Sequence, residues 1–341
     1  MISRARFQFL FFAVAALLLS PPVHAAAPYY EGKTIRIIVG TAPGGGYDTY
    51  TRLLARHFSK HIPGAPTVIV DNMPGAGGLL SANHMYRVAK PDGLTIGHFV
   101  GGQFLQQLLG RPGIEFDARR FEYIGVPAQD NFVLTVAKAT GVSSMDQWMS
   151  SKTTIKFGAI APGDGTYDIP KVIEATLSVP IQIVTGYKGT APIRLAFNSG
   201  EVAGLSNSWQ SLKSTWSKEL ESGEAIMLAQ MSTKSHADLP KLPLAMNLAK
   251  SDENRKLIVA VAQSHGAAVR PYLLPPETPK NLVEILRKSF LEAIRDPELL
   301  AEAKKARLEI NPGSGEELER NVKDLLLLDK PLVDRLKDIL K

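Results

Sequence analysis

The feature that most constrains the fold lies at residues 34–58. There, an apolar run of strand length is followed by a glycine turn and then by apolar residues at helical spacing. Residues 35–39 are Ile or Val except at one position, and apolar residues from Tyr50 onward recur at helical spacing. Gly44, Gly45 and Gly46 stand between the two segments. Because they have no Cβ, they let the backbone turn tightly and let a ligand approach the main chain. We therefore predict a strand, a tight turn and a helix over residues 34–58.

The start of that predicted helix is a place where an anion fits. The first N–H groups of a helix have no acceptor within it and carry partial positive charge. The glycines lack the G-x-G-x-x-G spacing, and no Lys-Ser/Thr pair follows them, which excludes a dinucleotide site and a P-loop. A turn that binds nothing is the alternative. Asp48, in the first helical turn, would either stabilise the helix end or hold the loop.

Residues 1–25 have the pattern of a secretory signal peptide. Arg4 and Arg6 precede an apolar stretch at 7–19, and Val23-His24-Ala25 then offers a cleavage site after Ala25. The apolar stretch is shorter than the about 20 residues that span a bilayer. The sequence contains no Cys, so neither a lipid anchor nor a disulfide is available. We expect an exported protein that a buried core stabilises.

Charge and length indicate a two-lobed protein that does not bind nucleic acid. Without the two arginines of the leader, the formal charge falls from +6 to +4, and no basic block interleaved with aromatic residues marks a nucleic-acid groove. The remaining chain of about 315 residues is longer than one core usually holds. We therefore expect two α/β lobes.

Strands and helices alternate along the chain, which predicts parallel sheets covered by helices. A second glycine turn at 71–78 follows a predicted strand at 67–70, and in such sheets ligands bind beyond the carboxyl ends of the strands. Further strands are predicted at 94–100, 122–126, 132–136, 155–160, 181–184, 202–206 and 225–229, and further helices at 145–150, 166–177 and 190–198.

The predicted domain boundaries follow from this order. Residues 26–126 form the first part of lobe 1, 127–265 form lobe 2, and 266–341 form a return crossing and C-terminal helices that pack on lobe 1. Pro279 and Pro297 each mark a helix start. Ser314 and Glu317 have capping-box spacing for the last helix.

Five glycine-containing motifs, taken in order, resemble a known family. They are IIVGTAPGGGYD at 37–48, DNMPGAGG at 71–78, PDG at 91–93, GDGT at 163–166, and GYKGTAP at 186–192 with NSGEV at 198–202. This succession, which spans nearly all of the mature chain, is similar to the extracytoplasmic solute receptors of tripartite tricarboxylate transporters, the Bug family.

The resemblance implies a periplasmic binding protein fold of type II. In it, two lobes, each a mostly parallel sheet flanked by helices, enclose a cleft and are joined by two crossings. It further implies a monomer, without catalytic activity, metal or cofactor, that binds a small organic carboxylate and passes it to a permease with a large and a small membrane subunit. A ligand-sensing partner of a membrane sensor kinase would share the fold and the ligand. A secreted enzyme on the same scaffold would need a nucleophile or metal set, and the sequence presents none.

The resemblance also implies which loops hold the ligand, using main-chain N–H groups, small hydroxyls and ordered waters. The first ligand loop maps onto 42–48 and the second onto 163–166. The candidate binding residues are Ala42, Gly44, Gly45, Gly46, Tyr47, Asp48, Gly77, Gly78, Gly163, Asp164, Gly165, Thr166, Tyr167, Thr190 and Asn207.

Acidic and aromatic residues near these loops leave the ligand open. Asp164 and Asp168 add negative charge beside an expected anion. They would either recognise a cationic or hydroxyl part of the solute, or stabilise the turn and the helix end. Tyr47 and Tyr167 would either stack on the solute or serve as packing.

Overall fold

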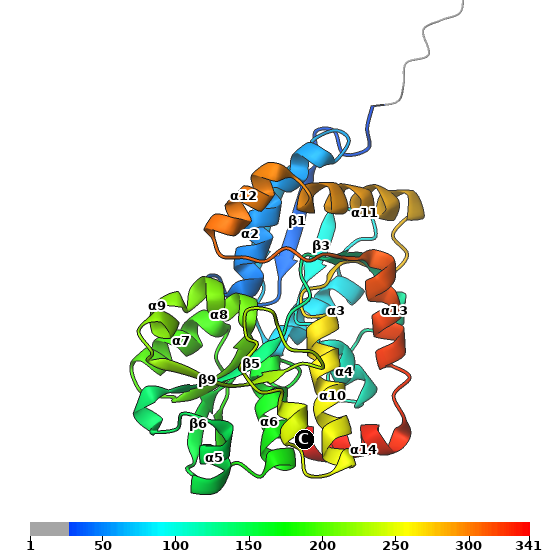
Figure 1. Ribbon diagram of the computed structural model, residues 1–341. Coiled ribbons are helices and arrows are strands. Elements are labelled where there is room, and N and C mark those ends of the chain that lie inside the picture. Colours follow the sequence, from blue (N-terminus) through cyan, green and yellow to red (C-terminus); the bar gives the residue numbers. More distant parts are fainter. Residues whose placement is uncertain (1–26) are drawn as a thin grey trace, which may run out of the picture.

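Two mixed sheets, one in each lobe, organise residues 27–341, the part of the chain that the computed structural model describes (Figure 1). The predicted signal peptide lies outside the described residues. The fold class predicted from the sequence, α/β with two lobes, is confirmed.

The first sheet contains the strand that precedes the glycine turn. Its order is β11-β4-β10-β3-β1-β2, in which β1 runs parallel to β2 and β3, and β10 runs antiparallel to β3 and β4. The strands are β1 (Thr34–Val39), β2 (Thr67–Asn72), β3 (Thr95–His98), β4 (Glu122–Val126), β10 (Tyr272–Leu274) and β11 (Gly313–Ser314).

The second sheet has the order β7-β6-β8-β5-β9, with β6 parallel to β7 and β8, and β5 antiparallel to β8 and β9. Its strands are β5 (Phe132–Ala137), β6 (Ile155–Gly158), β7 (Ile181–Val184), β8 (Gly204–Ser208) and β9 (Ala225–Met231). Both sheets are therefore mixed, since the returning strands enter them antiparallel to their neighbours.

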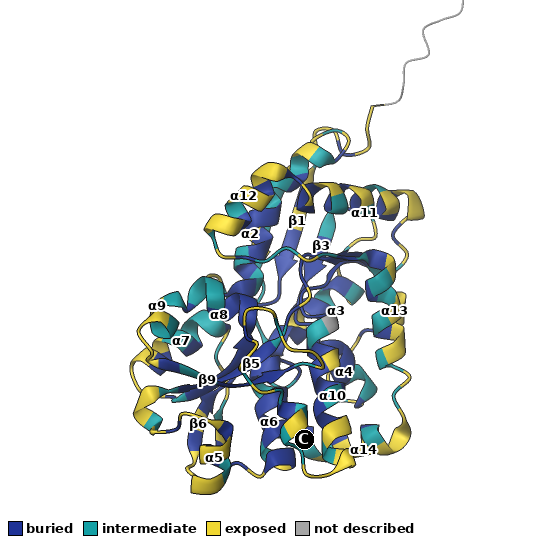
Figure 2. Ribbon diagram, in the orientation of Figure 1, coloured by how far each residue is buried: buried dark blue, intermediate teal, exposed yellow. Residues whose placement is uncertain are grey.

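Helices cover the sheets, and most of the strands between them are largely buried (Figure 2), whereas β2, at the edge of the first sheet, is exposed or half-buried along its length. The α-helices are α2 (Gly46–Phe58), α3 (Leu79–Arg87), α4 (Gln103–Leu108), α5 (Met145–Ser151), α6 (Gly165–Leu177), α7 (Thr190–Asn198), α8 (Trp209–Thr215), α9 (Ser217–Glu221), α10 (Asp252–Ala267), α11 (Lys280–Ile294), α12 (Pro297–Lys305), α13 (Gly315–Leu325) and α14 (Lys330–Leu340). The 3-10 turns are η1 (Ser59–His61), η2 (Ala76–Gly78), η3 (Ala118–Arg120), η4 (Lys138–Thr140) and η5 (Ala245–Leu248).

Each lobe has its own core. Ile35 and Ile37 of β1 are fully buried against α2 and α11 in lobe 1, whereas Trp148 stacks on Phe157 in lobe 2 with ring centroids 5.7 Å apart. The apolar run of β1 therefore has the role that its composition predicts, since β1 is an interior strand whose apolar side chains are buried on both faces of the sheet.

The last helix corrects the predicted domain division. α11, α12 and α13 pack on lobe 1, but α14 packs on α6 and α10 of lobe 2. There Val333, Leu336 and Leu340 are buried in the second core. Within residues 27–341 the chain therefore passes between the lobes three times rather than twice, at 127–131, 268–271 and 326–329.

The helix starts follow the predicted capping residues with one correction. The Asp296 carboxylate accepts the Glu298 N–H at 2.8 Å, as expected for the start of α12. Ser314 caps α13 rather than the last helix, since its Oγ accepts the Glu317 N–H at 3.2 Å. The last helix, α14, begins after Asp329.

The burial of α14 yields a stability prediction. We expect Leu336→Ala to lower the free energy of unfolding by about 2–5 kcal/mol, because it removes a fully buried side chain from the second core. The measurement is urea unfolding of the mature chain, followed by circular dichroism. Leu327→Ala is the matched control, because Leu327 is 80% exposed, and it should change stability by no more than about 0.5 kcal/mol. Equal effects of the two variants would show that α14 does not dock on lobe 2.

Candidate functional site

A cavity lies between the lobes, where loops from both sheets meet. The predicted residues that line it are Gly45, Gly46, Tyr47, Asp164, Thr166, Thr190 and Asn207. Thr41, Phe132, Ile160, Ser208, Ser211 and Val269, which the sequence analysis did not select, also line it. The cavity thus brings together parts of both ligand loops expected from the sequence.

The first loop presents main-chain N–H groups at the start of α2. Gly45 is the N-cap of this helix and Gly46 its first residue. Among the described residues, no acceptor bonds the N–H of either glycine. A free helix N-terminus in a cavity is a suitable partner for a carboxylate.

Lobe 2 approaches both glycines closely. A Cβ at Gly45 would lie 2.9 Å from Thr190 Oγ1, and one at Gly46 would lie 1.8 Å from Ser211 Oγ. The lobes also touch through the main chain, since the Ala42 N–H donates to the Lys188 carbonyl oxygen at 2.8 Å. The structure therefore has its lobes closed on one another.

Asp48 holds the first loop and does not line the cavity. Its carboxylate accepts the Gly44 N–H at 2.9 Å and the Asn72 amide at 3.1 Å, and it forms an ion pair with Arg52. Burial raises the pKa of Asp48, but these hydrogen bonds outweigh burial and bring it below its ordinary value. The Gly44 N–H is thus already used, which corrects the expectation that it binds the solute.

In the second loop, Asp164 caps α6. Its Oδ1 accepts the Thr166 N–H at 2.8 Å and the Thr166 hydroxyl. Asp164 is only 4% exposed, and burial raises its pKa in spite of these hydrogen bonds. Asp164 therefore both stabilises the helix start and lines the cavity.

Asp168 belongs to the interior of lobe 2. Its carboxylate accepts the Gly163 N–H at 2.9 Å and the Gln106 amide at 3.0 Å, and it lies 3.2 Å from His265 Nε2. Both Asp168 and His265 are buried. The Gly163 N–H is consequently unavailable to a solute, which corrects the prediction for Gly163.

The other predicted residues that do not line the cavity have packing roles. A Cβ at Gly77 would lie 3.1 Å from the Pro162 carbonyl oxygen, and one at Gly165 would lie 2.3 Å from the Phe132 ring. Gly78 packs beside Val100. The Tyr167 hydroxyl lies 3.5 Å from the carbonyl oxygen of Lys341, so Tyr167 does not stack on a solute in this cavity.

Asn207 lies inside β8 rather than after the strand as predicted, because β8 spans Gly204–Ser208. Its Oδ1 accepts the Ser208 N–H at 2.9 Å, while its Nδ2, buried at the cavity, has no partner among the described residues. The buried Thr41 hydroxyl, which belongs to another residue that lines the cavity, likewise has no partner among the described residues. Both groups are available for a solute or an ordered water.

A buried ion pair beside the cavity was missed from the sequence. Arg270 Nη1 lies 2.8 Å from Asp130 Oδ2, and both side chains are fully buried. The Arg270 guanidinium also donates to Ser208 Oγ at 2.6 Å and to Ser211 Oγ at 3.1 Å. In the sequence, Arg270 is a lone arginine in a proline-containing segment, and only the fold brings it to Asp130.

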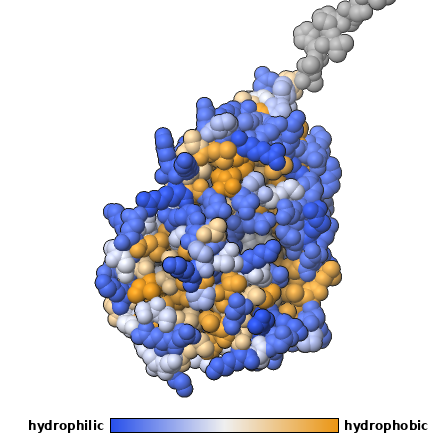
Figure 3. Space-filling view, viewed as in Figure 1, coloured by the Kyte–Doolittle hydropathy of each residue, from blue (hydrophilic) through white to orange (hydrophobic). Residues whose placement is uncertain are grey.

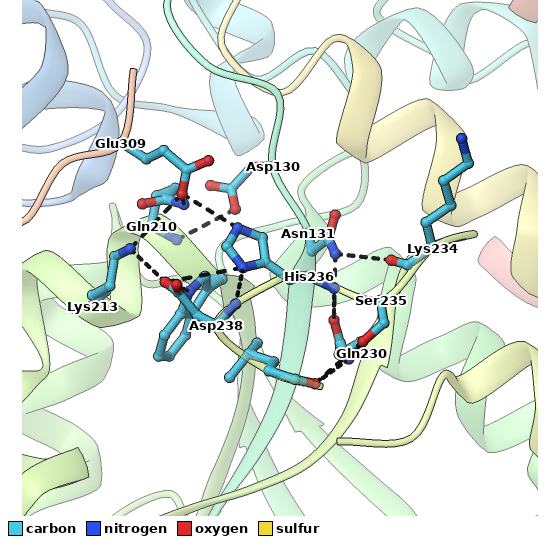
Figure 4. Close-up of polar contacts among 12 residues, drawn as sticks. Asp130, Asn131, Gln210, Lys213, Gln230, Lys234, Ser235, His236, Asp238 and Glu309 are labelled. Carbon is cyan, nitrogen blue, oxygen red and sulfur yellow. Dashed lines mark hydrogen bonds and ion pairs between the residues drawn. The ribbon is translucent and has the colours of Figure 1, made fainter. Parts of the chain in front are cut away.

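A second polar cluster links the lobes around Glu309 (Figure 4). Glu309 follows α12 of lobe 1, and its carboxylate accepts the Gln210 amide at 2.6 Å and lies 3.3 Å from His236 Nε2. His236 Nδ1 accepts the Asp238 N–H at 3.1 Å, so Nε2 carries the proton. The Lys213 ammonium lies 2.7 Å from the Asp238 carboxylate. The His236 imidazole thus has no free lone pair for a metal ion, and the Lys213 ammonium lies beside the cluster. We therefore interpret this cluster as a link between lobes rather than a metal site.

A family model, Tripartite tricarboxylate transporter family receptor, matches residues 51–337. The chain belongs to this family. The resemblance seen in the glycine motifs is thereby confirmed, and the protein is a ligand-binding receptor of this family rather than an enzyme.

Relatives and solved structures agree with that membership. The UPF0065 protein in the gbd 5' region of Cupriavidus necator is 27% identical over 84% of this chain and 82% of its own length. The periplasmic binding protein BugD has a TM-score of 0.74 at 22% identity, over 91% of this chain and 98% of its own. MatC from Rhodopseudomonas palustris, solved with bound malate, has a TM-score of 0.71 at 19% identity, over 91% of this chain and 99% of its own. These structures share the fold of this receptor.

On the face shown in Figure 3, hydrophilic residues cover most of the receptor and hydrophobic residues gather in patches between them. None of the helices in residues 27–341 combines the length and the apolar character needed to cross a membrane.

The buried ion pair yields a second prediction. We expect Arg270→Met to lower the free energy of unfolding by about 3–5 kcal/mol, because it leaves the Asp130 carboxylate buried without a cation. The double variant Arg270→Met with Asp130→Leu should recover most of that loss, since neither charge then remains. Urea unfolding measures the free energy of unfolding of the single and the double variant.

The matched control is Arg307→Met, which breaks an exposed ion pair with Glu221 and should cost no more than about 1 kcal/mol. A loss as small in Arg270→Met as in Arg307→Met would contradict the role given to the buried pair.

Proposed function

We propose that this receptor captures a small organic carboxylate between its lobes. The observation that carries the proposal is the start of α2, where Gly45 and Gly46 line an interlobe cavity and their N–H groups have no acceptor among the described residues. A carboxylate there would accept both N–H groups at the positive end of the helix dipole.

Structural relatives support a carboxylate as the solute class. MatC was solved with malate, and another R. palustris protein, with a TM-score of 0.70 at 22% identity over 90% of this chain and 97% of its own, was solved with adipate. Malate and adipate differ in length but share carboxylate ends, which is the group that the start of α2 suits.

The mechanism that we propose is capture, lobe closure and delivery, with no covalent step. The contacts between Ala42 and Lys188 and between Gly45 and Thr190 would form on closure around the solute. The closed receptor, exported to the periplasm and acting as a monomer, would pass the solute to the large and small subunits of a membrane permease driven by an ion gradient. The family's description as transporter receptors supports this step.

Thermal unfolding tests the proposed capture. In a panel of mono-, di- and tricarboxylates and amino acids, a ligand at a hundred times its dissociation constant adds about 2.7 kcal/mol to the folded state, enough to raise the melting temperature by a few degrees. We expect Gly45→Asp to abolish that rise, because the new carboxylate would occupy the start of α2 and its Cβ would meet Thr190 Oγ1.

The matched control is Ala139→Asp, which adds the same charge at an exposed position of lobe 2 and should keep the full rise. A rise in Gly45→Asp equal to that of the unaltered receptor would remove the first loop from the binding site.

A further inference from the structure

One charged side chain lines the interlobe cavity among the described residues, and it is negative. Asp164 is 96% buried, at 4% exposure, on the wall that lobe 2 contributes. Because the cavity suits a carboxylate at the start of α2, a negative charge on its wall limits which chemical group the rest of the solute can carry.

The Asp164 carboxylate has one oxygen to spare. Its Oδ1 accepts both hydrogen bonds from Thr166, and among the described residues no hydrogen bond or ion pair reaches Oδ2. The nearby basic side chains are held elsewhere, since His265 faces Asp168 and Arg270 pairs with Asp130. Asp164 is thus a buried carboxylate without a cation, an arrangement that is costly unless a bound group supplies one.

The polar groups that the two lobes contribute to the cavity differ in the charge that they attract. On the lobe 1 wall, Gly45 and Gly46 carry N–H groups without an acceptor among the described residues, at the helix start that attracts negative charge. On the lobe 2 wall, the Asp164 carboxylate attracts positive charge. A solute with two carboxylates and no cation would bring one of them against Asp164, and like charges at short range oppose binding.

We propose that the solute is an aminocarboxylate, with its carboxylate at the start of α2 and its ammonium on Asp164. This inference rests on the proposed function, because it presumes that the carboxylate binds at Gly45 and Gly46. Asp164 is accordingly a specificity-determining residue in addition to capping α6.

Isothermal titration with matched solutes tests the inference. One series is 4-aminobutyrate, 4-hydroxybutyrate and glutarate, and the other is aspartate, malate and succinate; within each series only the group that would face Asp164 changes. The receptor is first unfolded and refolded to remove any co-purified solute. We expect the ammonium compound of at least one series to bind about 30-fold or more tightly than its matched compounds.

Asp164→Asn removes the charge and retains a side chain suited to capping α6. It should weaken the ammonium compound about 30-fold or more and reduce its advantage over the hydroxyl compound. Asp146→Asn, which removes an exposed charge from the same lobe, should leave both affinities unchanged. A purely structural cap would leave the preference unchanged in Asp164→Asn.

The outcomes separate the two proposals. If glutarate or succinate binds as tightly as its ammonium counterpart, or if Asp164→Asn keeps the preference, the aminocarboxylate inference is overturned while carboxylate capture stands. If no compound of either series, and no carboxylate of the thermal panel, binds the refolded receptor, carboxylate capture itself is overturned and the inference with it.

Discussion

A buried ion pair between Arg270 and Asp130 joins two of the three chain crossings beside the cavity. Asp130 lies on the crossing that enters lobe 2, and Arg270 on the one that returns. From that position the guanidinium donates to Ser208 and Ser211, which line the cavity, and Ser211 in turn packs against Gly46 at the start of α2. The pair is fully desolvated, so each charge depends on the other, and the geometry of the cavity depends on both.

Three buried acids near the ligand loops have three different roles. Asp48 holds the first loop through Gly44 and Arg52, and Asp168 holds the second through Gly163 and His265. Each has its partners within the protein, which makes the loops rigid before any solute arrives. Asp164 has hydrogen bonds from Thr166 but no cation, and it is the acid that lines the cavity. Rigid loops around one unneutralised group are an arrangement suited to discrimination between solutes.

Much of the fold could be predicted because it depends on neighbouring residues. The run at 34–39, the glycine turn and the helix after it were recognisable from periodicity, and the start of α12 was recognisable from Pro297. Helix α10 escaped prediction because Leu257–Ala262 is an unbroken apolar run, which periodicity cannot distinguish from a buried strand. The docking of α14 on lobe 2 was missed because an amphipathic helix shows that it has an apolar face but not which core that face joins.

The sequence by itself determined the α/β class, the glycine loops, the family and the acids available beside those loops. Each of these depends on consecutive residues or on the order of the motifs. Only the tertiary structure decided what each acid does. Asp164 and Asp168 are four residues apart on one loop and helix, yet Asp168 meets His265 from α10 and Gln106 from α4, whereas Asp164 lines the cavity. Likewise, Arg270 finds Asp130 across 140 positions of sequence. A charge is neutralised by whatever lies within a few ångströms of it, and for buried groups that distance is set by packing between distant segments rather than by sequence spacing.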